Sequence, residues 1–477
     1  MAQDSRGNIK EEVLKAKLNE ETGEGKTEVS DIGEEFEVFF VDSNRYYTVD
    51  KDGNIIEEGK IVVDKSPGDI TKDENGNDIE EGQPYEIWCI EDLVAFSNMV
   101  NGSGIIIENG KAIEVNKSTN FSNKTVELKT NLNFKSKYSY ADSERTDFGN
   151  INGNESDGNT LINEMSTGTG FKPIGISYSK FFEGTFKGNN KSIKNIFQNG
   201  KTQLGLFTIV RNATIQDIVL TGNINSTNYT VGGICGSAEN TKIINCKNKA
   251  NIIEQGKING NNSYIGGIVG IAKNTDIINC SNEEDINGDA QTGGIVGNAS
   301  GNIINCYNIG DITGGIGGNY GAVGGIVGVG SSPSLSIYNC FNTGEITSNA
   351  TGVYTSAGGI LGNSGQNGTV NTIVNAYNIG KINEAYRGRG GIVGGLWYHN
   401  PANTATLKNT YYQEDGELLG YGEFASAQGI EKQNKDYMHS EKLVMNLNNY
   451  IKNNEDKIDT SQWKDWKLGE NGYPTFE

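Results

Sequence analysis

The sequence predicts an all-β fold, a β-solenoid in which coils of chain stack on one another. Three observations predict it. A Gly-rich segment recurs through residues 201–412, each copy consists of short β-branched runs between Gly and Asn, and the spacing of the copies is unequal. Helical repeats of this length would need long amphipathic stretches without internal glycine. Strands joined by tight turns fit the pattern instead.

The repeat is clearest in six copies that open on Gly-Gly-Ile. Their first glycines are residues 232, 266, 293, 324, 358 and 390, so the spacings are 34, 27, 31, 34 and 32. A seventh, degenerate copy begins at Leu204 and keeps the apolar positions. Unequal spacing suits a solenoid, because a loop insertion leaves the coil register intact. We therefore expect one repeat to form one coil, with rungs about 4.8 Å apart.

Stacked coils place equivalent residues in columns. The first column is small or apolar, which indicates the core: Ile218, Cys246, Cys280, Cys306, Cys340, Ala376 and Thr410. An asparagine column precedes it: Asn245, Asn279, Asn305, Asn339, Asn375 and Asn409. Another follows two residues later: Asn248, Asn282, Asn308, Asn342 and Asn378. Such columns predict amide ladders between rungs and left-handed turns. A polar binding track is the functional alternative.

These residues carry a family resemblance. The recurring GGIVG followed by I-x-N-C-x-N-x-G-x-I resembles the GLUG repeat of bacterial surface proteins. FFEGTFKGNNKSIKNIF, from Phe181, resembles the segment that precedes those repeats, and the ending from Trp463 through GYPTF resembles their closing segment. The resemblance covers roughly residues 120–477. It implies a right-handed parallel β-helix at the cell surface, an adhesive role and no shared catalytic residues.

Composition excludes several classes of partner. The net charge is −20 and the pI is about 4.7, which argues against binding to nucleic acid or to anionic membranes. No run of about 18 apolar residues occurs that would mark a membrane segment. The first residues do not form a signal peptide. We nevertheless expect an extracellular or cell-surface location, with a leader or anchor outside this sequence, because Gly/Asn/Thr-rich solenoids are typical of exported proteins.

Four regions are expected along the chain. Residues 1–83 should hold a mobile helix, a hairpin over 34–63 and an acidic linker, and their composition resembles pilin-like secreted proteins. Residues 84–200 should form an N-terminal cap, with a strand and a short helix, and the first irregular coils. The GLUG-like coils occupy 201–412. Residues 413–477 should cap the last rung with a helix over 440–452 and with Trp463, Trp466, Tyr473 and Phe476.

Catalytic motifs are missing from the sequence. Its two histidines, His399 and His439, lie in no zinc or nucleophile-base pattern. Residues 289–408 hold eight charged residues and no clustered carboxylate pair of the kind that glycosidases use. We expect no catalytic residues. A carbohydrate-active β-helix lyase or hydrolase is the enzymatic alternative.

One column of the repeat is acidic. Asp285, Asp311 and Glu345 share a repeat position, with Lys381 after them. Like charges on neighbouring rungs repel unless they are solvated or bridged by a cation, for which Ca²⁺ is the candidate. We expect no other cofactor, and the scattered cysteines predict no disulfide framework. A solvated outward face is the structural alternative.

A further column is aromatic: Tyr307, Phe341, Tyr377 and Tyr411. It directly follows the cysteine column, so strand alternation should turn these rings outward. The earlier coils hold Lys247 and Ser281 at this position. Stacked rings can stabilise the sheet face, and an exposed stripe would also suit a carbohydrate or a protein partner.

The lengthening loops of the later coils suggest a recognition patch. The last copy reads YRGRGGIVGGLWYHNPAN, which contains aromatic, cationic and imidazole side chains. The candidate ligand-binding residues are Arg387, Arg389, Trp397, Tyr398 and His399. Aromatic rings offer flat apolar area at low entropy cost, and guanidinium groups offer fixed donors. The alternative is a loop that leans on the C-terminal cap.

Together these observations predict a non-catalytic adhesion or binding module on a bacterial surface or pilus. Its expected partners are a glycan or a host or cell-surface protein, and other surface or pilus subunits. A rigid structural spacer of about ten rungs is the third interpretation, beside binding and catalysis.

Overall fold

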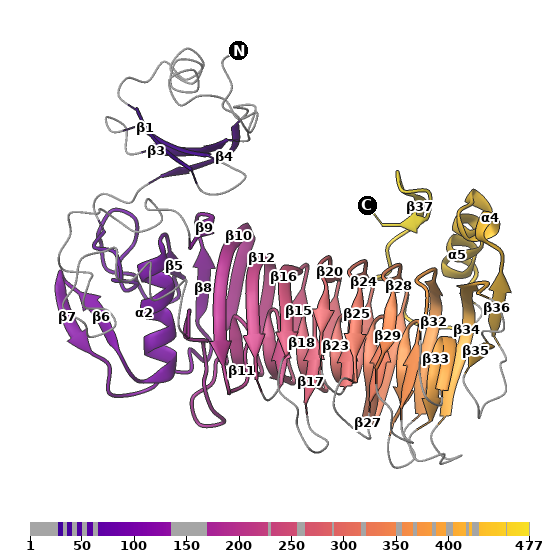
Figure 1. Ribbon diagram of the computed structural model, residues 1–477. Coiled ribbons are helices and arrows are strands. Elements are labelled where there is room, and N and C mark those ends of the chain that lie inside the picture. Colours follow the sequence, from indigo (N-terminus) through magenta and orange to yellow (C-terminus); the bar gives the residue numbers. More distant parts are fainter. Residues whose placement is uncertain are drawn as a thin grey trace. The chain divides into compact units, whose positions relative to one another are not determined.

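The fold was determined as a computed structural model (Figure 1). It describes residues 27–31, 36–40, 45–49, 55–60, 65–134, 169–227, 230–254, 263–288, 291–315, 321–349, 355–365, 370–383, 388–396, 404–415, 419–421, 429–454 and 456–476. The chain divides into two compact units. The first comprises Met1–Lys172 and Gly184–Ile196, and the second comprises Pro173–Glu183 and Phe197–Glu477.

The first unit begins with an antiparallel sheet. Its four strands, in spatial and sequence order, are β1 (Thr27–Asp31), β2 (Phe36–Phe40), β3 (Arg45–Val49) and β4 (Ile55–Lys60). The hairpin predicted over 34–63 corresponds to β2, β3 and β4, and β1 adds a strand that the sequence pattern does not predict. The predicted helix before it lies outside the described residues.

A helix and short parallel strands form the rest of this unit. The elements are β5 (Tyr85–Ile87), α2 (Ile90–Asn101), β6 (Ile105–Glu108), β7 (Lys111–Glu114), β8 (Thr125–Leu128), β9 (Leu132–Asn133) and the first part of β10 (Thr185–Gly200). β8 pairs in parallel with both β5 and β10. The strand and helix predicted after residue 84 are β5 and α2. The helix ends at Gly102, whose φ of 58° is left-handed.

The acidic segment predicted as a linker is partly packed, which corrects that expectation. Lys65 is buried and its Nζ donates to Asp92 Oδ2 at 3.0 Å. The backbone N–H of Gly68 donates to the other oxygen of Asp92 at 2.8 Å. Ile70 is 1% exposed. Composition suggested a linker because charges dominate it, but one buried carboxylate in the first turn of α2 gathers these donors.

The second unit is the solenoid. Its strands are β11 (Phe207–Arg211), β12 (Thr214–Ser226), β13 (Val231–Gly232), β14 (Cys235–Glu239), β15 (Lys242–Ile244), β16 (Lys247–Glu254), β17 (Tyr264–Gly266), β18 (Val269–Lys273), β19 (Asp276–Ile278), β20 (Ser281–Asn282), β21 (Ile286–Asn287), β22 (Gln291–Gly293), β23 (Val296–Ile304), β24 (Tyr307–Asn308), β25 (Ile312–Gly314), β26 (Ala322–Gly324), β27 (Val327–Tyr338), β28 (Phe341–Asn342), β29 (Ile346–Ser348), β30 (Ser356–Gly358), β31 (Leu361–Ser364), β32 (Val370–Asn378), β33 (Gly388–Leu396), β34 (Thr404–Gln413), β35 (Leu419–Tyr421) and β36 (Ile430–Gln433).

Each repeat forms one coil, as predicted. Strands of successive coils pair in parallel and lie side by side (Figure 1). The register follows the repeat: Ile243 pairs with Ile277, which pairs with Ile303. Such pairing keeps each side chain over its equivalent, so the apolar positions make a continuous core. The fold is therefore a parallel β-solenoid.

The cysteine column lies in that core. Cys246, Cys280, Cys306 and Cys340 are fully buried and free of disulfides. In three successive pairs the backbone N–H of one cysteine donates to the sulfur of the next, at 3.3 to 3.4 Å. The sulfur thus accepts a backbone bond at the turn. Burial raises the pKa of the Cys246, Cys280 and Cys306 thiols.

Both predicted asparagine ladders form. In the outer ladder, Asn245, Asn279, Asn305, Asn339, Asn375 and Asn409 have φ between 50° and 56°, and each later amide donates to the preceding coil at 2.6 to 3.0 Å. In the inner ladder, each amide from Asn248 to Asn342 donates to the following coil at 2.7 to 2.8 Å. The two ladders therefore run with opposite hydrogen-bond polarity.

The inner ladder explains the second glycine of Gly-Gly-Ile. A Cβ on Gly267 would lie 2.6 Å from the side chain of Asn282 and 2.3 Å from the carbonyl oxygen of Gly294. The same crowding recurs at Gly294 against Asn308 and at Gly325 against Asn342. Glycine and asparagine recur together because the buried amide fills the space that a side chain would take.

The C-terminal segment, residues 429–476 and here called the tail, leaves the coil. After β36 it forms α4 (Lys435–Met438), α5 (Glu441–Asn453) and a hairpin of β37 (Lys467–Leu468) and β38 (Pro474–Thr475). The helix predicted over 440–452 is α5, and Leu443, Val444 and Leu447 are its buried residues. None of the described helices has the length and apolar character needed to span a membrane.

The tail packs along the side of the solenoid, which corrects the expectation that its aromatic residues cover the last rung. One cluster joins α5 and Trp466 to the column that runs from Tyr307 to Tyr411. A second cluster joins Trp463 to Ile278, Ile304 and Val374, which belong to three different coils. The tail therefore bridges coils along the solenoid.

Candidate functional site

The aromatic column is the base of the candidate site. Tyr307 stacks on Phe341 at 4.9 Å between ring centroids and 5° between planes, and Phe341 stacks on Tyr377 at 5.2 Å and 2°. The four rings point out of the coil and contact the tail. Each of them is therefore only 0 to 8% exposed. The rings are therefore stacked, as the stabilising interpretation of this column predicts, and they form no exposed stripe because the tail covers them.

Several residues of the tail contact the aromatic column directly. Trp466 lies 5.8 Å from the Phe341 ring and 5.6 Å from the Tyr377 ring, between centroids. Phe476 packs on Trp466 at 4.3 Å. The Tyr377 hydroxyl donates to the carbonyl oxygen of Pro474. Burial raises the pKa of the Tyr377 hydroxyl well above its usual value.

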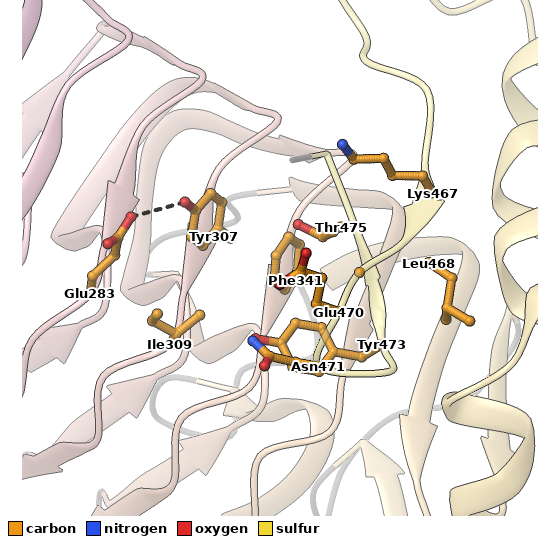
Figure 2. Close-up of a pocket in the computed structure, with 11 residues that line it drawn as sticks. Glu283, Tyr307, Ile309, Phe341, Lys467, Leu468, Glu470, Asn471, Tyr473 and Thr475 are labelled. Carbon is orange, nitrogen blue, oxygen red and sulfur yellow. Dashed lines mark hydrogen bonds between the residues drawn. The ribbon is translucent and has the colours of Figure 1, made fainter.

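A pocket remains where the tail hairpin lies beside the column (Figure 2). Its volume is ≈ 450 Å³. The coil side contributes Glu283, Tyr307, Ile309 and Phe341. The tail side contributes Lys467, Leu468, Gly469, Glu470, Asn471, Tyr473 and Thr475. The pocket thus combines aromatic rings with charged and amide groups, as ligand sites commonly do.

Glu283 is the best-connected polar group of the pocket. Its carboxylate accepts hydrogen bonds from Tyr307 Oη at 3.0 Å and Ser281 Oγ at 3.2 Å. Lys249 lies 2.9 Å away and Lys247 lies 3.7 Å away. Burial alone would raise the pKa of Glu283, but the bonds and charges of Lys249, Lys247 and Tyr307 outweigh it and hold that pKa below its usual value.

This arrangement suits binding of a hydroxyl-bearing ring. Tyr473 lies 6.2 Å from Phe341 between centroids, on the opposite wall. Asn471 Nδ2 donates to Tyr473 Oη at 3.3 Å, so the amide is set beside the ring. Aromatic rings offer apolar contact, while carboxylate and amide groups exchange hydrogen bonds with hydroxyls. Across the residues that the structure describes, no group of three or more His, Cys, Asp or Glu side chains could hold a metal ion.

The acidic column has bonds of its own. The backbone N–H of Asp311 donates to Asp285 Oδ1 at 2.9 Å, and that of Glu345 donates to Asp311 Oδ1 at 2.7 Å. Glu345 accepts a bond from Asn383. All three carboxylates are exposed. Backbone donors and solvent thus account for the column, and calcium binding stays a prediction.

The predicted recognition patch lies mostly outside the described residues. Arg387, Trp397, Tyr398 and His399 all fall there. Arg389 is described: it lies on β33, is exposed, and its guanidinium is 3.9 Å from Asp415 Oδ2. Arg389 is thus the one described residue of the five, and the binding role of the patch stays a prediction.

The sequence interpretation missed Glu283 and the hairpin residues of the pocket. One signal was available for Glu283: it lies two residues beyond the aromatic position, where the preceding coil has Lys249 and the next has Ile309. A lysine and a glutamate on adjacent rungs predict an ion pair. No periodicity could place Lys467, Asn471 or Tyr473, because they lie outside the repeat.

Comparison with known proteins identifies the repeat. The family model of the GLUG motif matches residues 227–253 and 261–287. These matches coincide with the coils that contain Cys246 and Cys280. GLUG repeats are typical of extracellular and surface proteins. No curated protein matches the chain.

A solved structure resembles this chain over most of the length of both proteins. It is a crystal structure from Bacteroides ovatus of a protein proposed to be an immunoglobulin A1 protease. It shares 17% identity, with 83% of this chain and 93% of that chain covered, and the TM-score is 0.45. At that TM-score the likeness carries no argument about activity. The identification therefore stands on the motif and the coils: the chain carries GLUG repeats, each of which forms one coil of a parallel β-solenoid.

Proposed function

We propose that this chain is a non-catalytic extracellular binding module of a bacterial surface or pilus, and that it binds glycans in the pocket beside Tyr307. The observation that supports this most is the composition of the pocket. Stacked rings from the coil and Tyr473 from the tail flank Glu283, Asn471 and Lys467. Pyranose rings present an apolar face and a rim of hydroxyls, which match such walls.

The state of Glu283 supports binding over glycosidic catalysis. A general acid needs a raised pKa so that it is protonated at working pH. The pKa of Glu283 is lowered, and two lysines and a tyrosine hydroxyl occupy its carboxylate. Such a group accepts hydrogen bonds and does not deliver a proton.

A glycan-array and mucin-binding screen tests the proposal, with a reducing-sugar assay in parallel. We expect saturable binding without turnover. Glu283→Gln and Asn471→Ala should each weaken binding about fivefold or more, the loss expected for one or two hydrogen bonds. Glu284→Gln is the matched control, because Glu284 is exposed and does not line the pocket.

Three outcomes would contradict the proposal. Release of reducing ends would show that the chain is an enzyme. No binding to any glycan would remove the pocket's assigned ligand. Equal losses for Glu283→Gln and Glu284→Gln would place the binding site elsewhere, and Arg389 would then be the residue to change next.

A further inference from the structure

The outer asparagine ladder binds main-chain peptide groups of the tail. The run Gln462 to Trp466 crosses two rungs. Asn305 Nδ2 donates to the carbonyl oxygen of Gln462 at 2.7 Å, and Asn305 Oδ1 accepts from the backbone N–H of Lys464 at 3.1 Å. Asn339 Nδ2 donates to the carbonyl oxygen of Lys464 at 2.9 Å, and its Oδ1 accepts from Trp466 Nε1 at 2.6 Å.

These contacts use the full hydrogen-bonding capacity of each amide. An asparagine side chain offers two N–H donors and two acceptor lone pairs. At Asn305, one donor and one acceptor join the ladder to Asn279 and Asn339, and the other two bind the tail. Bonds within the ladder therefore use one donor and one acceptor of each amide. The other donor and acceptor are left for a peptide that crosses the rungs.

At two rungs of the same ladder, Asn245 and Asn279, the second donor and the second acceptor of the amide bind no other described residue. Asn279 donates to Asn245 at 3.0 Å and accepts from Asn305 at 2.8 Å. Asn245 donates to Asp217 at 2.8 Å and accepts from Asn279. Asn245 is exposed and Asn279 is partly exposed, whereas Asn305 is 1% and Asn339 is 0% exposed.

Among the described residues, the tail's hydrogen bonds to the ladder end at Asn305, although Trp463 packs on Ile278 beside Asn279. A turn, closed by the Trp463 N–H on the carbonyl oxygen of Thr460 at 2.9 Å, brings it onto the ladder at Asn305. The outward column beside the ladder changes at the same place, from Tyr307 to Ser281 and Lys247. The exposed rungs therefore continue an interface that the tail occupies further along.

We propose that Asn245 and Asn279 form a docking track for an extended peptide segment of a partner protein, bound through its main chain as the tail is bound by Asn305 and Asn339. The occupant is a peptide because the second donor and acceptor of each amide repeat the arrangement that pairs with two peptide groups at Asn305, and with a peptide carbonyl and the Trp466 indole N–H at Asn339. This track is separate from the glycan pocket, and the inference does not depend on it.

The tail's own sequence provides the probe. A fluorescent peptide of residues 461–467, SQWKDWK, is titrated into the full chain and followed by anisotropy. We expect saturable binding. A peptide N-methylated at the position of Lys464 should lose it, because the methyl group removes the N–H that an amide oxygen must accept.

Paired variants separate the track from general stability. Asn279→Asp removes the donor and keeps the left-handed turn, which Asp217 already adopts in this column with φ of 59°. It should weaken peptide binding about fivefold or more. Asn409→Asp makes the same change at the far end of the ladder and should leave binding unchanged.

Photo-crosslinking of the bound peptide locates it. Crosslinks to residues 242–249 and 276–283 are the expected result. Crosslinks to residues 305–341 would show that the probe replaces the tail, and would overturn the proposal. Absence of saturable binding, full binding by the N-methylated peptide, or equal effects of Asn279→Asp and Asn409→Asp would overturn it as well.

Discussion

The two halves of the solenoid's flank differ although their coils are alike. Towards the N-terminal end the outward position holds Lys247 and Ser281, and towards the C-terminal end it holds Tyr307, Phe341, Tyr377 and Tyr411. The inner asparagine ladder and the second glycine of Gly-Gly-Ile recur in both halves. The tail covers the aromatic column and reaches one coil beyond it, where Trp463 packs on Ile278. The coil therefore fixes the scaffold, and one outward column decides what packs on it.

Removing a ring from the aromatic column should give the largest difference in stability between the two halves. Phe341→Ala should lower the free energy of unfolding of its coil by about 3–5 kcal/mol, because Phe341 is buried between Tyr307, Tyr377 and the tail. Ser281→Ala at the equivalent position should cost less than about 1 kcal/mol. Native-state hydrogen exchange resolves the two coils. Similar losses would mean that the column does not distinguish the halves.

The interior should show no such contrast. Gly267→Ala in the open half and Gly325→Ala in the covered half should each cost about 3 kcal/mol, since both place a Cβ within 2.6 Å of an asparagine side chain and within 2.3 Å of a carbonyl oxygen. The two losses, measured by denaturant unfolding monitored with hydrogen exchange, should agree. A difference of more than about 1 kcal/mol would contradict the equivalence of the coils.

The outer ladder should show an intermediate contrast. Asn245→Ala and Asn305→Ala each put alanine in a left-handed turn, at about 1 kcal/mol. Asn305→Ala also loses its bonds to Gln462 and Lys464, worth about 1 kcal/mol each. Thermal unfolding should rank Asn305→Ala as the more damaging change. The reverse order would show that the tail adds nothing at this rung.

The smallest effect concerns pH at the boundary between the halves. The folded-state pKa of Glu283 lies below its unfolded value of about 4.3, so its contribution is present above that pH and is lost as pH falls through the folded pKa. The stability gap between the wild type and Glu283→Gln should therefore narrow in acid. It should stay below about 1 kcal/mol at pH 7. Melting curves from pH 7 to 3 test this, with Glu284→Gln as the matched control at an exposed carboxylate outside the pocket.

Sequence periodicity predicted what the repeat determines. Coil, core and both ladders follow from residues such as Cys280 and Asn279 that recur in register. Strand alternation also gave the outward direction of Tyr307 and Phe341. The cover over them could not follow from periodicity, because the tail residues on Phe341, from Trp466 onward, lie outside the repeat and far along the chain. One signal for the cover was available in the sequence: the tail holds four aromatic residues between Trp463 and Phe476, and the coils hold four aromatic residues in one column.

The ladders make coils interchangeable in evolution. Within each ladder every amide bonds to the neighbouring coil in the same way, so duplication or loss of a whole repeat leaves the bonds between rungs intact. The tail removes this freedom where it spans several coils at once, from Ile278 to Tyr411. We therefore expect relatives of this protein to differ in length by whole repeats inserted before the Ile278 coil, while the spacing from there to the C-terminus stays constant.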